Sequence, residues 1–188
     1  MELNMAKPYR FTVLTVALLC LSSNSFSASV SGTINVNISL EAGCVINGNN
    51  TLDGDSAIDF GTLDFGSVPT VFVQQDSAVT GGAANGIAVV CSSGVTPSFA
   101  IASGNNDGSI VGGVGNGNHT MSDGSGNYVD YAIFSDPARS NRIENNASIL
   151  MAVFTDTTPQ TIELYGRAYG TSNVAGSYSD TLNVTLSW

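Results

Sequence analysis

Few residues of this chain have types and spacings that could do chemistry, and the first to weigh is its single histidine. His119 lies in the stretch 103–127, which is rich in Gly, Asn, Ser and Asp. Such a stretch predicts a loop, in which His119 is exposed to solvent. A lone histidine supports neither a Ser-His-Asp triad nor a histidine-rich metal site.

Three aspartates, Asp53, Asp55 and Asp59, suggest a cation loop at first sight. An EF-hand loop that began at Asp53 would need a bidentate glutamate where Asp64 stands. We therefore interpret them as turn and surface acids. No pair of carboxylates stands out as the acid and base of a glycosidase either. The sequence thus predicts no catalytic residue, no metal ligand and no cofactor, and the protein is not expected to be an enzyme.

The N-terminus has the order of a leader. Lys7 and Arg10 precede the apolar run 11–21, and small residues follow up to Ala28. This order predicts a secretory signal peptide over residues 1–27, whose apolar run is too short to span a bilayer. The alternative is a lipidated Cys20, but a lipoprotein signal would place a small residue where Leu19 stands.

Cys44 and Cys91 are the two cysteines that remain after cleavage. A lone pair of cysteines in an exported chain predicts a disulfide formed in an oxidising compartment. Closing the loop between Cys44 and Cys91 stabilises the fold by about 4 kcal/mol on the chain-entropy model.

The chain is acidic, with a formal net charge of −10. Cleavage of the leader removes Lys7 and Arg10, so residues 28–188 contain no lysine and only three arginines, Arg139, Arg142 and Arg167. Nucleic acid and anionic membranes are excluded as partners because both require a cationic face. No membrane insertion is expected after the signal is removed.

The rest of the chain reads as short strands separated by turn residues, which predicts an all-β sandwich. The expected strands are 44–46, 58–65, 70–73, 86–91, 98–102, 128–134, 149–154, 161–168 and 182–188. The segments 47–54, 81–85 and 103–127 are expected to be loops.

Residues 28–40 alternate strictly between apolar and polar side chains, so this segment predicts a strand that is apolar on one side only. The apolar side consists of Val30, Gly32, Ile34, Val36, Ile38 and Leu40. Gly32 either weakens the strand near a terminus or marks a shallow part of a groove, where one strand can displace another.

The C-terminal strand shows the same one-sided pattern at Leu182, Val184, Leu186 and Trp188. No segment follows to pair with it, and an open sheet edge over an apolar core invites another strand. We therefore hypothesise that residues 28–40 of one molecule fill an acceptor groove beside this strand in another molecule, an arrangement known as donor-strand complementation. The alternative is that the segment folds into its own sheet and gives a monomer.

Several short motifs resemble the spore coat protein U domain family, which includes the Csu-type pilins of archaic chaperone-usher systems. The resemblance covers nearly all of residues 28–188 in the same order. The motifs are Gly43-Cys44-Val45, the stretch 60–66, Val89-Val90-Cys91, the stretch 131–139, Tyr165-Gly166-Arg167 and the stretch 175–181. The chain departs from the family at 143–146, where members often have Trp-Gly, and at Phe134, where Tyr is common.

The resemblance implies that residues 41–188 form an incomplete immunoglobulin-like β-sandwich, completed by a donor strand from a neighbouring subunit. It further implies a periplasmic chaperone, an outer-membrane usher and identical or related pilin subunits as partners. The product would be a surface fimbrium used in adhesion and biofilm formation. The alternative function is a secreted coat or carbohydrate-binding β-sandwich that does not polymerise.

Overall fold

The computed structural model describes residues 28–82, 86–112, 117–172 and 174–188. The predicted signal peptide, residues 1–27, lies outside the described residues. The chain divides between Ile38 and Ser39 into two units. No helix in the described ranges is long and apolar enough to cross a membrane.

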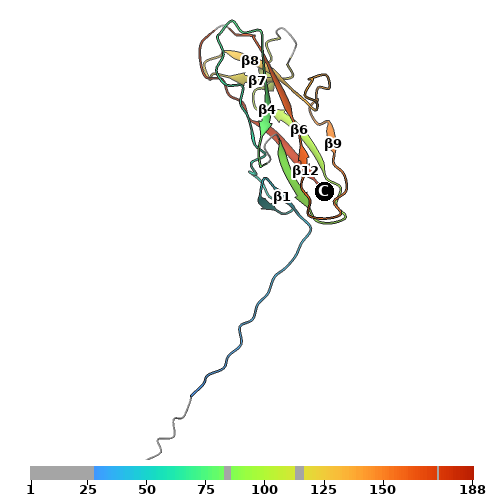
Figure 1. Cartoon of the computed structure of the whole chain (residues 1–188). Coiled ribbons are helices and arrows are strands. Elements are labelled where there is room, and N and C mark those ends of the chain that lie inside the picture. The colour runs from blue at the N-terminus through green and yellow to red at the C-terminus, as the bar shows by residue number, and fades with distance from the viewer. Residues whose placement is uncertain (1–27, 83–85, 113–116, 173) are drawn as a thin grey trace, which may run out of the picture. The chain divides into compact units, whose positions relative to one another are not determined.

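Residues 39–188 form an all-β body, which confirms the predicted fold class (Figure 1). Three antiparallel sheets have the orders β10-β5-β1-β2, β3-β4-β11-β8-β7 and β12-β6-β9. A short 3-10 turn, η1 (Asp107–Ser109), follows β6. The strands are β1 (Cys44–Ile46), β2 (Asn49–Thr51), β3 (Thr62–Leu63), β4 (Gln74–Thr80), β5 (Ile87–Cys91), β6 (Ser98–Gly104), β7 (His119–Ser122), β8 (Tyr128–Phe134), β9 (Ser148–Leu150), β10 (Gln160–Ile162), β11 (Tyr165–Tyr169) and β12 (Leu182–Ser187).

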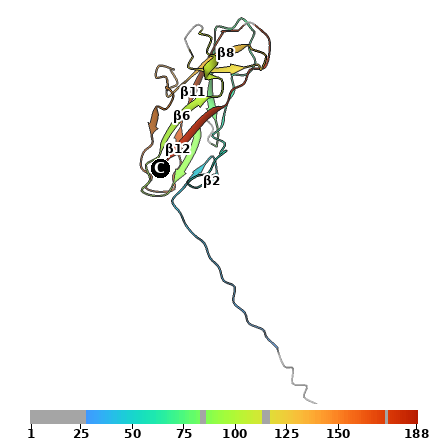
Figure 2. The same cartoon turned by 180° about the vertical axis from the view of Figure 1, so that it is seen from behind.

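One hydrophobic core joins the three sheets. Val89 of β5, Ile101 of β6 and Ile133 of β8 belong to a single buried cluster. Strand β8 is buried on both faces, since Ala132 and Phe134 pack into a second cluster with Tyr169. Figures 1 and 2 show β8 at one end of the body, and β1, β2 and the C-terminus at the other, with β6 and β12 running between.

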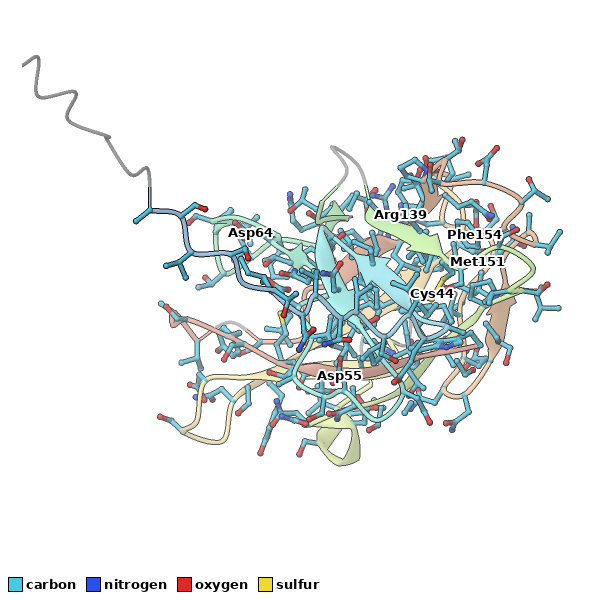
Figure 3. All side chains as sticks on the ribbon, turned by 90° about the horizontal axis from the view of Figure 1, so that it is seen from below. Cys44, Asp55, Asp64, Arg139, Met151 and Phe154 are labelled. Carbon is cyan, nitrogen blue, oxygen red and sulfur yellow. A yellow bond between two sulfur atoms is a disulfide. The ribbon has the colours of Figure 1, made fainter. Side chains whose placement is uncertain are left out.

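The predicted disulfide is confirmed. Cys44 and Cys91 are bonded, and they face each other directly in the register of β1 and β5. Both are almost completely buried. Figure 3, a view from below, places Cys44 among the packed side chains of the body.

Three strands were missed by the sequence pattern: β2, β4 and β7. Strand β2 follows a two-residue turn, Asn47-Gly48, in which both residues have positive φ, and Asn-Gly is a strong signal for such a hairpin. Strand β4 is polar except near its end, because the backbone ladders to β3 and β11 hold it rather than apolar burial. Strand β7 lies inside the predicted loop 103–127.

Other predicted strands were wrong in extent. Within 58–65 only β3 forms, 70–73 contains no strand, and 149–154 contains only the end of β9. The predicted strand 161–168 is two strands, because the chain leaves the sheet of β5 after Ile162 and joins the sheet of β4 at Tyr165. The apolar alternation continues through this crossing, so periodicity alone could not reveal it.

Candidate functional site

Residues 28–40 leave one apolar face uncovered. No strand is assigned to them, and Figure 1 draws residues 28–38 without helix or strand. The exposed fractions of Val30, Ile34, Val36, Ile38 and Leu40 are 100%, 90%, 87%, 83% and 85%. Side chains of this kind gain about 1.5–3 kcal/mol each on full burial. The segment therefore exposes an apolar face that a groove of matching shape would stabilise.

Each of the three sheets ends in strands that pair on one side only among the described residues, and two of these strands, β3 and β12, line the same cavity. Strand β12 pairs only with β6, and β3 pairs only with β4. Just ahead of β12, Ser179 forms one isolated bridge, with Ser122. Unpaired edges of this kind present free backbone N–H and C=O groups to any incoming strand.

Three cavities follow one another and share lining residues, and β12 lines the first two. The first lies between residues 51–60 and the end of β12. The second shares Ile58, Phe60 and Val184 with the first, and the third shares Leu63, Phe65 and Tyr178 with the second. We call this continuous depression the β12 groove.

In the second cavity, the floor of the β12 groove is the hydrophobic core itself. Phe99, Ile101 and Tyr131 line the second cavity and are at most 3% exposed. Residues in 58–65 form the wall of the groove opposite β12. Two aromatic pairs connect this wall to the floor: Phe60 with Phe99, and Phe65 with Tyr131. An apolar strand seated here would extend the core rather than cover a polar surface.

A glycine allows the wall opposite β12 to keep its apolar side chains in the groove. Ile58 and Phe60 have one parity along the chain, and Leu63 and Phe65 have the other. Gly61 lies between them with φ +117°, and a Cβ at this position would come 2.4 Å from the carbonyl oxygen of Thr80. The change of parity therefore requires glycine.

The structure brings the four predicted acceptor residues together on the β12 groove. Leu182 lines the second cavity, Val184 lines the first and second, and Leu186 and Trp188 line the first. Leu186 is buried, whereas Trp188 is 39% exposed. The sequence did not predict the opposite wall or the floor as part of the site, although Phe60 and Phe65 lie in one of the motifs that carry the resemblance.

His119 was predicted to be an exposed loop residue, and this was wrong. It is the first residue of β7 and is completely buried. Its Nδ1 lies 2.9 Å from Oδ1 of Asp107, and its ring packs on that of Tyr131 at a centroid distance of 5.3 Å. The surrounding Gly/Asn composition hid a short strand whose histidine is part of the core.

Tyr131 and Asp180 connect the floor of the β12 groove to the chain just before β12. The Tyr131 hydroxyl donates to Oδ2 of Asp180 at 2.7 Å. Burial, together with this hydrogen bond to a carboxylate, raises the pKa of Tyr131 far above its ordinary value, so the hydroxyl keeps its proton. Asn106 donates to the other carboxylate oxygen through its backbone N–H and its side chain.

The arginine motif of the stretch 131–139 has a structural role. Arg139 donates to the backbone oxygens of Gly166 and Ser77, 3.0 and 2.8 Å away, and so ties its own loop to β11 and β4. Arg167 and Arg139 both approach the carboxylate of Asp76, at 2.6 and 3.3 Å. These contacts give the arginine motif a structural explanation.

Two of the three acids that suggested a cation loop accept backbone hydrogen bonds in turns, as expected. Oδ2 of Asp55 accepts from the backbone N–H of Leu52, and Oδ1 of Asp59 accepts from that of Gly61. Within the described part of the chain, no group of three or more potential metal-ligating side chains comes together.

Comparison with known proteins adds the following findings. The family model described as Spore Coat Protein U domain matches residues 30–185. Among solved structures, the chain is similar to a chaperone–tip adhesion subunit pre-assembly complex, CsuC–CsuE, from the archaic chaperone-usher Csu pili of Acinetobacter baumannii, with 20% identity and a TM-score of 0.43. That alignment covers 79% of this chain and 40% of the other. No curated protein sequence matches the chain.

Proposed function

The chain belongs to the Spore Coat Protein U domain family, and we propose that it acts there as a structural, non-enzymatic pilin subunit that polymerises by donor-strand complementation. In this proposal residues 28–40 of one subunit occupy the β12 groove of the next. A periplasmic chaperone supplies a stand-in strand before assembly, and an outer-membrane usher exports the fibre. The product is a surface fimbrium that serves attachment and biofilm formation.

One observation carries this proposal: a single chain holds an uncovered apolar strand segment and an uncovered apolar groove. The segment offers apolar side chains at every second position from Val30 to Leu40 except Gly32. The β12 groove offers a core floor and a free backbone edge on β12. Each feature supplies what the other lacks, as in β-strand addition.

In this proposal the favourable free energy of assembly comes from the subunit that receives the donor strand. Burying the five large apolar side chains of the segment gains about 8–15 kcal/mol. Ordering roughly eleven backbone residues costs about 1–2 kcal/mol each, which cancels that gain. Assembly must therefore be driven by covering the groove floor and by the new hydrogen-bond ladder along β12. An empty groove is costly, and this is why a chaperone strand is expected.

A truncation experiment tests the proposal. The mature chain, residues 28–188, is compared with residues 41–188 for oligomers that resist heat and detergent. Only the longer chain should form them, and a synthetic peptide of residues 28–40 should raise the melting temperature of the shorter one. A peptide with Val36→Asp is the matched control. A truncated chain that melts as high as the mature chain, and that the peptide does not stabilise, would refute the proposal.

A further inference from the structure

The ladder that holds the wall of the β12 groove is interrupted near the start of β12. The ladder between β12 and β6 shifts register between Asn183 and Val184, with Ala102 left over on β6. A bulge of this kind interrupts the ladder hydrogen bonds. The other edge of β12 has no strand beside it among the described residues. Leu182 and Asn183 pair with Gly104 and Ser103, but the bulge separates these two pairs from the rest of the ladder.

A partly buried polar network fixes the chain directly before this point. Asp180 accepts the Tyr131 hydroxyl on one carboxylate oxygen and Asn106 on the other. The backbone N–H of Asn105 also donates to the carbonyl oxygen of Thr181 at 3.1 Å. Asn106 and Asp180, which these contacts join, lie 74 positions apart in the sequence. Tyr131 belongs to β8, so its hydroxyl connects the start of β12 to a second sheet.

The Tyr131 ring itself contacts two other rings, those of His119 and Phe65. His119 packs against it and pairs with Asp107, whose second oxygen accepts from the backbone N–H of Gly104 at 2.7 Å. A Cβ on Gly104 would come 2.3 Å from Oδ2 of Asp180 and 2.5 Å from Oδ1 of Asp107, so glycine leaves room for both carboxylates. The ring lines the groove, and its hydroxyl holds the groove wall.

We propose that Tyr131 and Asp180 are positioning residues that hold the start of β12 in place before the donor strand arrives. This inference rests on the proposed function, because it concerns how that groove receives its strand. A groove whose wall is already placed loses less conformational freedom on binding. The network should therefore speed the arrival of a donor strand more than it slows its departure.

Tyr131→Phe in the mature chain is the direct test, since it removes the hydroxyl and keeps the ring. Without the hydrogen bond from the hydroxyl to the carboxylate, the start of β12 is held less firmly. We therefore expect the rate of assembly to fall about tenfold. Hydrogen exchange at residues 179–186 of the monomer should rise, while exchange in β5 and β8 stays unchanged. The dissociation rate of assembled oligomers should also stay unchanged.

Tyr165→Phe is the matched control, because the Tyr165 hydroxyl also donates to a carboxylate, that of Glu163, but lies away from the groove. It should change neither assembly nor exchange at 179–186. Asn106→Ala, at a half-buried loop position, provides a second route to loosen Asp180 if Tyr131→Phe unfolds the protein.

The outcomes separate the two proposals. If Tyr131→Phe and Asn106→Ala assemble as fast as the wild type and the control Tyr165→Phe, the positioning role is wrong and the pilin function stands. If exchange rises evenly over the whole body, the role is only structural and the inference is overturned. If the wild type itself does not assemble, the pilin function fails, while local exchange at 179–186 still decides the positioning role.

Discussion

Cys44 and Cys91 lie directly opposite each other across β1 and β5, with their Cα atoms 4.0 Å apart. The residue before Cys44 is fixed as well: the backbone N–H of Gly43 donates to the Ser92 hydroxyl, and that of Ser92 donates to the carbonyl oxygen of Gly43. Only three residues, 41–43, separate Cys44 from Leu40, the last apolar residue of the donor segment. In a fibre, tension on the donor segment would therefore reach the body at its covalent cross-link.

Replacing both cysteines by serine should lower the free energy of unfolding by about 4 kcal/mol, because the unfolded chain regains the freedom of the loop that the bond closes. Urea denaturation of the truncated body and of the peptide-bound body measures this loss. Reduction of the wild type serves as the control. A loss below about 1 kcal/mol in both forms would show that the bond does not anchor β1.

Val36→Asp in the mature chain should abolish assembly, whereas Asn35→Asp should not. Val36 lies on the apolar side of the segment, and Asn35 lies on the other side. Losing the burial of Val36 alone costs about 1.5–3 kcal/mol, which is roughly a tenfold to hundredfold loss of affinity, and the carboxylate adds its desolvation. A ladder of detergent-resistant oligomers on a gel reports the outcome. Equal effects of the two aspartates would contradict the assigned face.

Gly32→Val should slow the exchange of one donor strand for another. If Gly32 faces a shallow part of the groove, a valine there adds apolar contact at the place where an incoming strand would start displacement, and release slows by roughly tenfold or more. Competition of assembled subunits with a labelled peptide of residues 28–40 gives the rate. Ser31→Val, on the opposite side, is the control. Unchanged exchange kinetics would remove this role for Gly32.

Acid should destabilise the body through Asp76. The hydrogen bond from Arg167, aided by the charge of Arg139, holds the pKa of Asp76 below its ordinary value. A depressed folded-state pKa contributes stability that is present above the unfolded pKa and is lost as the pH falls through the folded pKa. Stability should thus be level above about pH 5 and decline below about pH 4.

Asp76→Asn isolates this contribution. It should lower stability at pH 7 by about 1 kcal/mol or less, because the pair is partly exposed, and it should flatten the acid limb of the profile. Urea midpoints between pH 3 and pH 7 measure both effects. The acid limb will not vanish, since backbone N–H groups also lower the pKa of Asp136. An unaltered acid limb would contradict the assignment.

Much of the fold followed from period-two patterns, and the failures have physical causes. Strand β12 alternates regularly, while β5 and β8 are short, largely apolar runs between turn residues, and all three were found close to their true bounds. Strand β4 was missed because backbone ladders on both edges hold it, and such pairing leaves no apolar signature. Hydrogen bonding between distant segments is not encoded in local alternation.

The site divided in the same way. The residues of β12 that alternation predicted as acceptor residues line one groove. The floor and the far wall could not be predicted, because Tyr131 and Phe60 meet β12 only through tertiary packing. His119 was misplaced because its neighbours have loop composition, while its own burial depends on Asp107 and Tyr131 from other elements.

Complementation in trans tests the central claim most directly. Val36→Asp removes the donor and leaves the β12 groove, and Val184→Arg blocks the groove and leaves the donor; circular dichroism confirms that both variants are folded. Native mass spectrometry should find each variant monomeric alone, and their mixture should give one-to-one dimers and nothing longer. A mixture that stays monomeric, or a wild-type chain that is itself a stable monomer, would contradict the account.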